Sequence, residues 1–384
     1  MRITILADLP AIAQVTDEAV GRGGGHAATW LIQLAREFSQ TPDLHVTWVT
    51  MDQDMTGRSE MHDYNQAFVR IPQGKRSIDI LANHFFARRK LLLEVRQSRP
   101  DVMHVFGTEG SYASILGSVP CPTVLSMQGI LTELRKREAL PNSWRATLQS
   151  YYEPGWVNKA TIVTCESQWA AEMVKRFSPG SDCRVVPYGV HPDFYQTKWS
   201  PDPESPAVLF CGHAYYGKGI DLLLAACELP PKPRWRCLVA GVGDYHSCRE
   251  KYPRVTWLGN LTWPALRKAM QTAWVLAHPT RGDSNPNAVK EARVIGLPVV
   301  TSKHGGQAEY IRNGENGWIV DPLTPEGLRA RLDLMCSNYE LTRRMGACRL
   351  VEDRAAFRPE RTTESFVSIY REIGKRRAEI GDGR

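Results

Sequence analysis

The sequence lacks the patterns that mark several large classes of protein. It has no run of about 18 apolar residues, so no transmembrane helix is expected. Its nine cysteines form no C-x-x-C pair, which argues against a disulfide framework or a zinc site and favours reduced thiols in a cytoplasm. The basic residues are scattered without an aromatic–basic stacking motif, so nucleic acid is not an expected partner. The opening segment, Met1 to Asp8, is too short for a signal peptide.

The composition that remains is that of an ordinary globular protein, with 42% hydrophobic and 23% charged residues. A chain of 384 residues exceeds the size at which one hydrophobic core keeps growing, so two domains are expected. The net charge of +7 suits phosphorylated substrates or an anionic membrane surface. The same balance is common among proteins that bind neither.

The stretch from Trp274 to Val320 carries the clearest pattern. Trp274 to His278 is a short apolar run, which predicts a buried parallel strand. A helix should follow, with Asn285 as its N-cap, Pro286 as its first residue and Gly296 at its C-terminal end. In such a strand–loop–helix unit the free N–H groups of the first helical turn point into a crevice at the carboxyl edge of the sheet. That position favours a phosphate.

Two acidic residues flank this helix start. Asp283 lies in the loop before the helix, and Glu291 lies in its second turn. Carboxylates accept hydrogen bonds from sugar hydroxyls. A ligand with phosphate in its middle and hydroxyls on either side fits this arrangement, and a nucleotide-sugar is such a ligand. The alternative explanation is an ordinary strand–helix–strand unit with a capped helix.

This stretch resembles the signature of retaining glycosyltransferases of family 4, which have the GT-B fold. The signature is two acids separated by seven residues, followed by G-x-P-V-V and G-G-x-x-E, and it falls on Asp283, Pro286, Asn287, Glu291, Gly296, Pro298, Gly305, Gly306 and Glu309. The first acid of the family is usually Glu, and the shorter Asp283 reaches less far. The resemblance covers nearly the whole chain, and is strongest from Ala207 to Asp321.

The resemblance implies an α/β protein of the GT-B fold, in which two doubly wound Rossmann-like domains face each other across a cleft. We expect an acceptor-binding domain at 1–195, a linker at 196–206, a nucleotide-sugar-binding domain at 207–360, and a helix at 361–384 that crosses back to the first domain. The apolar runs predict strands at 2–7, 45–50, 67–72, 101–106, 122–127, 161–165, 184–187, 207–211, 236–240, 255–258, 274–278 and 297–301. The pattern of 77–100 predicts one long helix.

Expected contacts to the donor phosphates follow from the same resemblance. Lys218 lies on a glycine-flanked loop before a helix, where a mobile point charge suits a phosphate leaving group. Relatives usually carry an arginine where this chain has His213, which as a neutral ring would donate only one hydrogen bond. A glycine-rich loop after the first strand faces the donor phosphate in the family, although it also fits a mobile surface turn. The expected phosphate contacts are therefore Lys218, His213, Asn287, Ala288, Gly24 and Gly25.

Contacts to the rest of the donor are expected nearby. Asp283, Glu291 and Glu309 would bind the sugar and the ribose, and Asp283, Glu291 and Lys218 would be the catalytic residues. Gly241, Gly243 and Asn260 would line the nucleobase region. Backbone contacts there carry no side-chain signature, so the sequence does not distinguish UDP from GDP.

The acceptor side is less well marked. Gln128 stands where relatives commonly have His-Gly or His-Asp, and its amide cannot take a proton at neutral pH. This agrees with a retaining mechanism that needs no protein base, with the departing phosphate removing the proton as a hypothesis. Glu109 and Glu133 are candidates for holding the acceptor, whereas His104 is expected to be a core histidine with satisfied hydrogen bonds.

The resemblance implies transfer of a hexosyl unit from a nucleotide-sugar to a hydroxyl of a glycan, a lipid-linked or a small-molecule acceptor. No metal and no other cofactor is expected. Two alternatives stay open: a nucleotide-sugar epimerase or hydrolase of the same fold, and a nucleotide-sugar-binding protein without catalysis. The expected location is the cytoplasm, with peripheral contact to an anionic membrane through the basic cluster Arg88 to Lys90 beside Phe85 and Phe86. A solvated helix face is the favoured explanation of that cluster.

Overall fold

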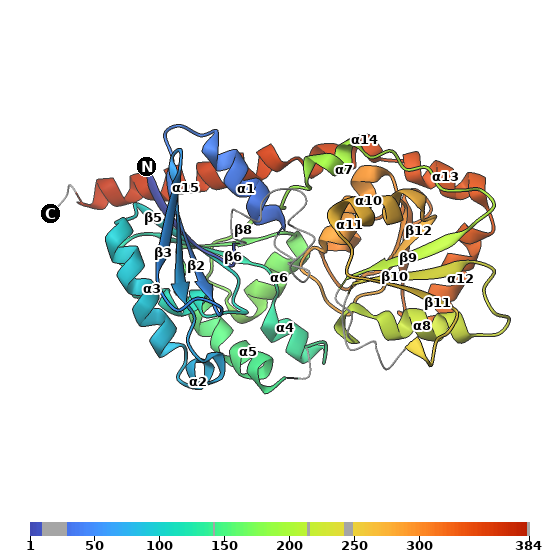
Figure 1. Ribbon diagram of the computed structural model, residues 1–384, viewed down its shortest axis with the longest axis horizontal. Helices are drawn as coiled ribbons and strands as arrows, with labels where there is room; N and C mark the ends of the chain where they lie inside the picture. Colours follow the sequence, from blue (N-terminus) through green and yellow to red (C-terminus); the bar gives the residue numbers. More distant parts are fainter. Residues whose placement is uncertain (10–28, 141–142, 213–215, 242–248, 382–384) are drawn as a thin grey trace.

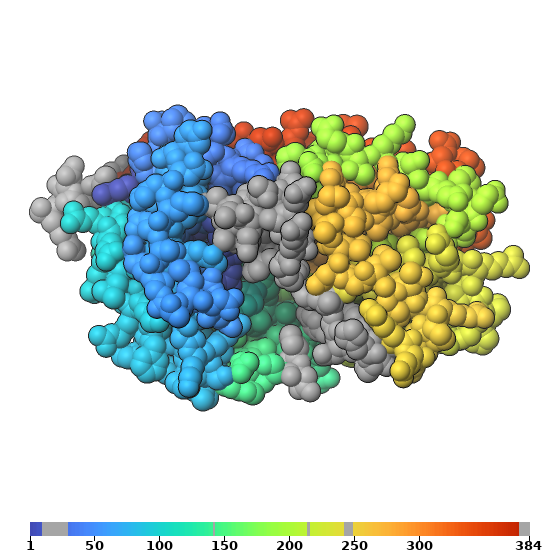
Figure 2. Space-filling view, in the orientation of Figure 1, coloured from blue at the N-terminus to red at the C-terminus, as the bar shows by residue number. Residues whose placement is uncertain are grey.

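The structure is a computed structural model, and it describes residues 1–9, 29–140, 143–212, 216–241 and 249–381. The molecule is elongated, and its two β/α lobes form the two ends (Figures 1 and 2). No helix within the described ranges is both long and apolar enough to cross a membrane.

The first lobe is built on an eight-stranded sheet in the order β3-β4-β2-β1-β5-β6-β7-β8. All neighbours are parallel except β3, which pairs antiparallel with β4. The strands are β1 Arg2–Leu6, β2 His45–Asp52, β3 Ser59–Asp63, β4 Gln66–Pro72, β5 Val102–Phe106, β6 Thr123–Met127, β7 Ile162–Cys165 and β8 Cys183–Val185. Its helices are α1 Thr29–Ser39, α2 Arg76–Leu81, α3 Phe85–Ser98, α4 Leu131–Lys136, α5 Trp144–Val157 and α6 Gln168–Phe177, with a 3-10 turn η2 at Tyr112–Ile115.

The second lobe has a six-stranded parallel sheet in the order β11-β10-β9-β12-β13-β14. Its strands are β9 Ala207–Cys211, β10 Arg236–Ala240, β11 Val255–Gly259, β12 Val275–His278, β13 Val299–Ser302 and β14 Gly317–Val320. Its helices include α8 Ile220–Glu228, α10 Trp263–Thr272, α11 Asn287–Ile295, α12 Pro325–Cys336, α13 Tyr339–Ala347 and α14 Leu350–Ala356, with 3-10 turns η3 at Tyr216–Lys218 and η4 at Gly306–Glu309.

Each sheet is covered by helices on both faces, because its strands are apolar on both sides. In β9, Val208 and Phe210 pack under α8 and α12, whereas Ala207 and Leu209 pack with α10 and α11 on the opposite face. Two parallel sheets covered on both faces are the doubly wound architecture that the sequence predicted, so the predicted fold is confirmed.

The chain crosses between the lobes twice. The helix α7, Pro192–Gln196, follows the first sheet but places Phe194 in the core of the second lobe. The last helix, α15 Pro359–Gly381, follows the second lobe and runs along the first (Figure 1), where Phe366 and Tyr370 enter the core. The two crossing segments are in contact at Gly189 and Pro359. A Cβ on Gly189 would lie 2.4 Å from the Cα of Pro359, so a larger side chain does not fit there.

Two predictions of secondary structure in the first lobe are wrong. The predicted helix 77–100 is two helices, because Asn83 and His84 take positive φ values of 47° and 55°. The edge strand β3 was not predicted, since all five of its residues are exposed and mostly polar. Its pairing with β4 therefore leaves no apolar pattern in the sequence.

His104 is the core histidine that the sequence predicted. It is fully buried, and burial lowers the pKa of its ring well below the usual value. Its Nδ1 lies 2.5 Å from the hydroxyl oxygen of Tyr370 on α15, and its Nε2 lies 2.7 Å from Oγ of Ser126 on β6. The neutral ring therefore has a hydrogen-bond partner on each nitrogen, and one of them belongs to the helix that returns from the second lobe.

Replacing Tyr370 by phenylalanine should destabilise the protein by about 1–3 kcal/mol, because one buried nitrogen of His104 loses its partner. The measurement is urea unfolding followed by tryptophan fluorescence. Tyr64→Phe is the control, since Tyr64 is 92% exposed and should unfold like the parent protein. Equal unfolding midpoints for Tyr370→Phe and Tyr64→Phe would contradict this account.

Candidate functional site

The candidate site lies where the carboxyl ends of strands from both lobes meet. A cavity of about 280 Å³ is lined by Glu109, Gln128, Gly129, Ile130, Leu131, Leu134, Leu140 and Trp169 of the first lobe and by Lys218, Gly282, Asp283 and Ser284 of the second. Glu109 follows β5 and Gln128 follows β6, whereas Asp283 lies in the loop between β12 and α11. The structure thus brings two predicted acceptor-side residues next to two predicted donor-side residues.

Lys218 and Asp283 form an ion pair across two loops of the second lobe. Burial alone would raise the pKa of Asp283, but the Lys218 charge outweighs it and holds that pKa well below its usual value. Asp283 is therefore ionised throughout the neutral range. The sequence predicted that Lys218 contacts a phosphate and that Asp283 contacts a sugar hydroxyl. In the structure the two side chains pair with each other.

His278, the last residue of β12, completes this cluster and was not singled out in the sequence. Its Nε2 lies 3.6 Å from Oδ2 of Asp283, and only 2% of its side chain is exposed. Burial lowers the pKa of its ring, which Asp283 only partly opposes, so the ring is neutral near pH 7. Within the described part of the chain neither ring nitrogen has a hydrogen-bond partner.

The loop from β12 to α11 differs from its predicted capping. The first helical residue is Asn287, and Pro286 is the N-cap residue without a side-chain cap. The prediction that Asn285 caps the helix is wrong, because its Nδ2 donates to the carbonyl of Glu166 at 3.3 Å and to the Tyr310 hydroxyl at 3.1 Å. Both partners lie outside the loop, and one belongs to the other lobe.

The first turn of α11 therefore keeps its N–H groups without a side-chain cap. Asn287 and Ala288 provide two of them and are half-buried. Gly296 ends the helix with a φ of 97°, as predicted. The free N–H groups and the helix dipole favour an anion at this end.

Two of the predicted site residues, Glu109 in the cavity lining and Glu291 on α11, have carboxyl groups with raised pKa values. Burial raises the pKa of Glu291 on α11 to about 7, which the neighbouring Lys290 only partly opposes. Burial also raises the pKa of Glu109 to about 7, although its carboxylate accepts a hydrogen bond from the backbone N–H of Gly129. Each group is thus near half-ionised at neutral pH.

Other predicted site residues are engaged elsewhere or lie outside the described residues. Glu133 does not line the cavity, because its carboxylate pairs with Arg137 at 2.8 Å within α4. Glu309 accepts hydrogen bonds from the backbone N–H groups of Gln168 at 3.2 Å and Trp169 at 2.7 Å, and so caps α6 of the first lobe. His213, Gly24, Gly25 and Gly243 lie outside the described residues.

The predicted nucleobase region lies at the ends of β10 and β11. Gly241 follows β10 with a φ of 125°, and a Cβ there would lie 2.2 Å from the carbonyl oxygen of Gly212. Asn260 is exposed in the loop after β11. Backbone and an exposed amide therefore form this part of the sheet edge.

The second glycine of the G-G-x-x-E motif, Gly306, has a packing role at the contact between the lobes. A Cβ on Gly306 would lie 2.1 Å from the Ser284 carbonyl oxygen and 2.5 Å from the Ser167 side chain. Ser167, at the start of α6, donates from its hydroxyl to that same carbonyl at 2.6 Å. Glycine is required here because backbone from one lobe approaches the other closely.

Sequence reasoning missed a buried ion pair that joins the lobes. Nζ of Lys290 on α11 lies 2.6 Å from Oε2 of Glu166, which follows β7 in the first lobe. The Lys290 side chain is fully buried, and it also donates to the Tyr188 carbonyl at 3.2 Å. A carboxylate at the carboxyl end of a strand was a usable signal for Glu166. A lysine in an amphipathic helix gave none.

The cavity brings the Lys218 cation and the Asp283 carboxylate next to Glu109, whereas Glu291 and the first N–H groups of α11 are not part of its lining. No group of three or more His, Cys, Asp or Glu side chains in the described ranges is placed to hold a metal ion. Two Rossmann-like lobes with a cleft between them are the GT-B fold, which solved glycosyltransferase structures share.

Comparison with protein families identifies the chain more closely. The model of glycosyl transferases group 1 matches residues 193–348, and the model of glycosyltransferase family 4 matches residues 23–194. The two matches meet without a gap. The chain therefore carries a glycosyltransferase family 4 domain followed by a glycosyl transferases group 1 domain.

Among curated relatives, D-inositol 3-phosphate glycosyltransferase of Segniliparus rotundus is 30% identical over 183 residues, which are 44% of this chain and 40% of the relative. The gpi3 subunit of phosphatidylinositol N-acetylglucosaminyltransferase from Schizosaccharomyces pombe is 31% identical over 143 residues, or 33% and 30% of the two chains. The matched segments thus span less than half the length of these relatives.

Two solved structures show the same fold over nearly the whole chain. Sucrose-phosphate synthase of Thermosynechococcus elongatus superposes with a TM-score of 0.80 at 17% identity, covering 97% of this chain and 98% of that one. HepE of Anabaena, in complex with UDP-glucose, superposes with a TM-score of 0.71 at 16% identity, covering 97% and 100%.

Proposed function

We propose that the protein is a retaining glycosyltransferase that moves a hexosyl unit from a UDP- or GDP-sugar to a hydroxyl of an acceptor. The acceptor class is a glycan, a lipid-linked glycan or a small molecule. The observation that carries the proposal is the cavity between the lobes, where Lys218 and Asp283 of one lobe face Gln128 and Glu109 of the other. The domain boundaries at 195, 206 and 360 are part of the same proposal.

The chemistry breaks the bond between the anomeric carbon and the diphosphate oxygen. Lys218 leaves Asp283 to contact the diphosphate, and together with the N–H groups at the start of α11 it stabilises the charge that develops there. Asp283 then accepts a hydrogen bond from a sugar hydroxyl, and His278 offers a neighbouring ring nitrogen. The acceptor oxygen attacks from the side of the leaving group, and its proton passes to the departing phosphate.

The first lobe provides positioning rather than a base in this proposal. The amide of Gln128 can donate or accept a hydrogen bond but cannot take a proton. Glu109 lines the same cavity and would hold an acceptor hydroxyl. The site needs no metal, because Lys218 and the helix N-terminus supply the positive charge.

A thermal-shift screen with UDP, GDP, ADP and their common sugar conjugates tests the proposal. A ligand at about 100 times its Kd stabilises the folded state by about 2.7 kcal/mol, so one nucleotide family should raise the melting temperature. Turnover of that donor should then require an acceptor. Donor consumption without any acceptor would favour an epimerase or hydrolase, and binding without turnover on any acceptor would favour a binding protein. No shift with any nucleotide would overturn the proposed site.

Donor affinity should rise with pH through the titration of Glu291. The ionised carboxylate accepts hydrogen bonds from ribose hydroxyls better than the protonated acid does. With a pKa of about 7 for Glu291, its ionised fraction increases from about pH 6 to about pH 8, and the Kd for UDP or GDP should fall by up to about tenfold. Isothermal titration calorimetry at several pH values measures this.

Glu291→Gln should remove that contribution, whereas Glu109→Gln should keep it. Ionisation of the nucleotide's own phosphate contributes equally to all three proteins, so only the difference between them reports on Glu291. Equal pH dependence of binding in the parent protein and in Glu291→Gln would show that Glu291 does not contact the donor.

Peripheral contact with an anionic membrane is also part of the proposal. Leu81, Phe85, Phe86 and Leu93 on α2 and α3 are 43–66% exposed, and the basic cluster Arg88 to Lys90 lies beside them. Exposed aromatic side chains next to cations suit the surface of an anionic bilayer. The double variant Phe85→Ser/Phe86→Ser should sediment less with phosphatidylglycerol vesicles, whereas Val351→Ser, exposed on α14, should sediment like the parent protein. Equal sedimentation of all three would refute this contact.

A further inference from the structure

A second cavity lies at the amino ends of the strands of the first sheet. Its volume is about 820 Å³, and the residues that line it include Arg2, Asp101 and Cys121, which lie at or before the amino ends of β1, β5 and β6. The cavity of the candidate functional site lies beyond the carboxyl ends of β5 and β6. Strands of five residues separate the two edges by about 16 Å, so the second cavity is a separate site.

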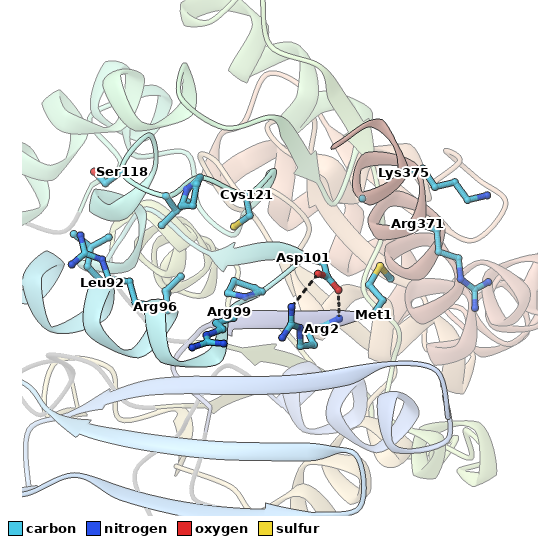
Figure 3. A pocket seen from close by; sticks show the side chains of 15 residues that line it. Met1, Arg2, Leu92, Arg96, Arg99, Asp101, Ser118, Cys121, Arg371 and Lys375 are labelled. Carbon is cyan, nitrogen blue, oxygen red and sulfur yellow. Dashed lines mark hydrogen bonds and ion pairs between the residues drawn. The ribbon is translucent and has the colours of Figure 1, made fainter. Parts of the chain in front are cut away.

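Two helices form the sides of this cavity (Figure 3). The last turns of α3 lie on one side and α15 on the other, with the pair of Arg2 and Asp101 between them. Apolar surface comes from Leu92, Val95, Pro100, Val119 and Pro120. A concave, partly apolar space of this volume is within the usual range for small-molecule sites.

Positive charge is concentrated around this apolar surface. Arg96 and Arg99 lie on the side of α3, and Arg371 and Lys375 on the side of α15. None of these four side chains has an ion-pair partner among the residues that the structure describes. Asp101 is the one acid in the lining, and it already accepts the Arg2 backbone N–H at 2.7 Å and lies 3.7 Å from the Arg2 guanidinium.

We propose that this cavity binds an anionic amphiphile, that is, a molecule with a phosphate or carboxylate head group on an apolar body. The head group would contact a cation on one side of the cavity, Arg96 on the α3 side or Arg371 on the α15 side, and the apolar body would cover Val119 and Pro120. Four cations without acidic partners attract an anion, and an apolar floor selects one that carries hydrocarbon. The site goes beyond the proposed transfer reaction, because it contains none of the cleft residues.

A ligand in this cavity would also affect how α15 is held against the first lobe. This helix follows the second lobe, and Thr362 near its start donates from its hydroxyl to the Pro187 carbonyl at 2.9 Å and accepts the Gly189 N–H at 2.9 Å, both in the segment that leads to α7. A ligand held between α3 and α15 would thus tie the returning helix more firmly to the first lobe. Ligand binding should therefore also raise the melting temperature.

The test is isothermal titration calorimetry of the full chain with n-octyl phosphate below its critical micelle concentration. Octyl glucoside tests the apolar body without the charge, and inorganic phosphate tests the charge without the apolar body. We expect saturable binding of octyl phosphate and much weaker binding of the other two. The double variant Arg96→Ser/Arg371→Ser should weaken binding by about tenfold or more, because it removes the charged contact on either side of the cavity.

Arg176→Ser/Arg361→Ser is the matched control. It removes the same charge from two helices, α6 and α15, at exposed positions outside the cavity lining and outside the Arg88 to Lys90 cluster. Its affinity should stay within about twofold of the parent protein. Val119→Trp, which fills the apolar floor, should weaken binding without changing the charge. Equal affinities of the cavity variants and the control, or equal binding of octyl glucoside, would overturn the proposal.

The source of the ligand is settled by a parallel measurement with phosphatidylglycerol vesicles. Vesicle binding that Arg96→Ser/Arg371→Ser weakens and the control variant keeps would assign the head group of a bilayer lipid. Binding of dissolved octyl phosphate alone would assign a soluble metabolite of the same chemistry. Nucleotide-induced stabilisation does not depend on this cavity, so a failure here leaves the proposed transferase site untouched.

Discussion

Replacing Lys218 by alanine should lower the turnover of sugar transfer by about 100- to 1,000-fold, the usual effect of losing one group that stabilises charge in the transition state. The structure places this lysine in the cleft on a short 3-10 turn, where it pairs with Asp283. The Asp283 carboxylate therefore holds the Lys218 ammonium group in the cleft, where the donor phosphate would bind. When the diphosphate departs, its negative charge grows. The Lys218 ammonium group therefore stabilises the transition state more than it stabilises the bound donor.

Steady-state kinetics with the donor found in the thermal-shift screen measures this effect. The substitution should lower kcat and kcat/KM by the same factor and leave KM unchanged, as expected for an interaction made in the transition state. Lys303→Ala is the control, because Lys303 pairs with Asp321 at 2.8 Å on the exposed surface of the same lobe. A Lys218→Ala enzyme as active as Lys303→Ala would remove the phosphate-stabilising role from this account.

The parts of the fold that were predicted from the sequence are those that local pattern determines. Apart from β14, which was not predicted, apolar runs place the parallel strands within about two residues, because such strands are apolar on both faces. Gly296 predicts the end of α11, because a left-handed residue is needed there. The strand β3 and the break at His84 have no such pattern, because pairing with β4 and a positive φ decide them.

The candidate site divides in the same way. The spacing of Asp283 and Glu291 could be read from the sequence, because both lie within one loop and the helix that follows it. The partners of Asn285 and Glu309 could not, since both side chains bind backbone of the other lobe. A residue type states which hydrogen bonds are possible, and only the packing of the two lobes decides which of them form.

The pair of Lys290 and Glu166 depends most strongly on that packing. Replacing Lys290 by methionine should destabilise the folded protein by about 3–5 kcal/mol, because it leaves a buried carboxylate without its counter-charge. Methionine keeps the length and the apolar part of the side chain, so the loss is electrostatic. Urea unfolding near pH 8 measures it, and Lys303→Met at the exposed pair should change stability by no more than about 1 kcal/mol.

The dependence of this loss on pH tests its cause. Burial raises the pKa of Glu166 even in the intact pair, where Lys290 opposes the shift. Without Lys290 that pKa rises further, so the folded variant holds a proton that the unfolded chain releases near pH 4.5. Stability is then lost as pH rises from that value toward the folded-state pKa, and the deficit relative to the parent protein should be small in acid and largest above neutrality.

A second substitution separates the charge from the packing. Lys290→Met/Glu166→Gln removes the unpaired carboxylate, and it should recover a large part of the stability that Lys290→Met loses near pH 8. A deficit that is the same at every pH, and that the second substitution leaves unchanged, would mean that Lys290 stabilises the junction by packing alone. In that case the ion pair would not be what holds α11 against the first lobe.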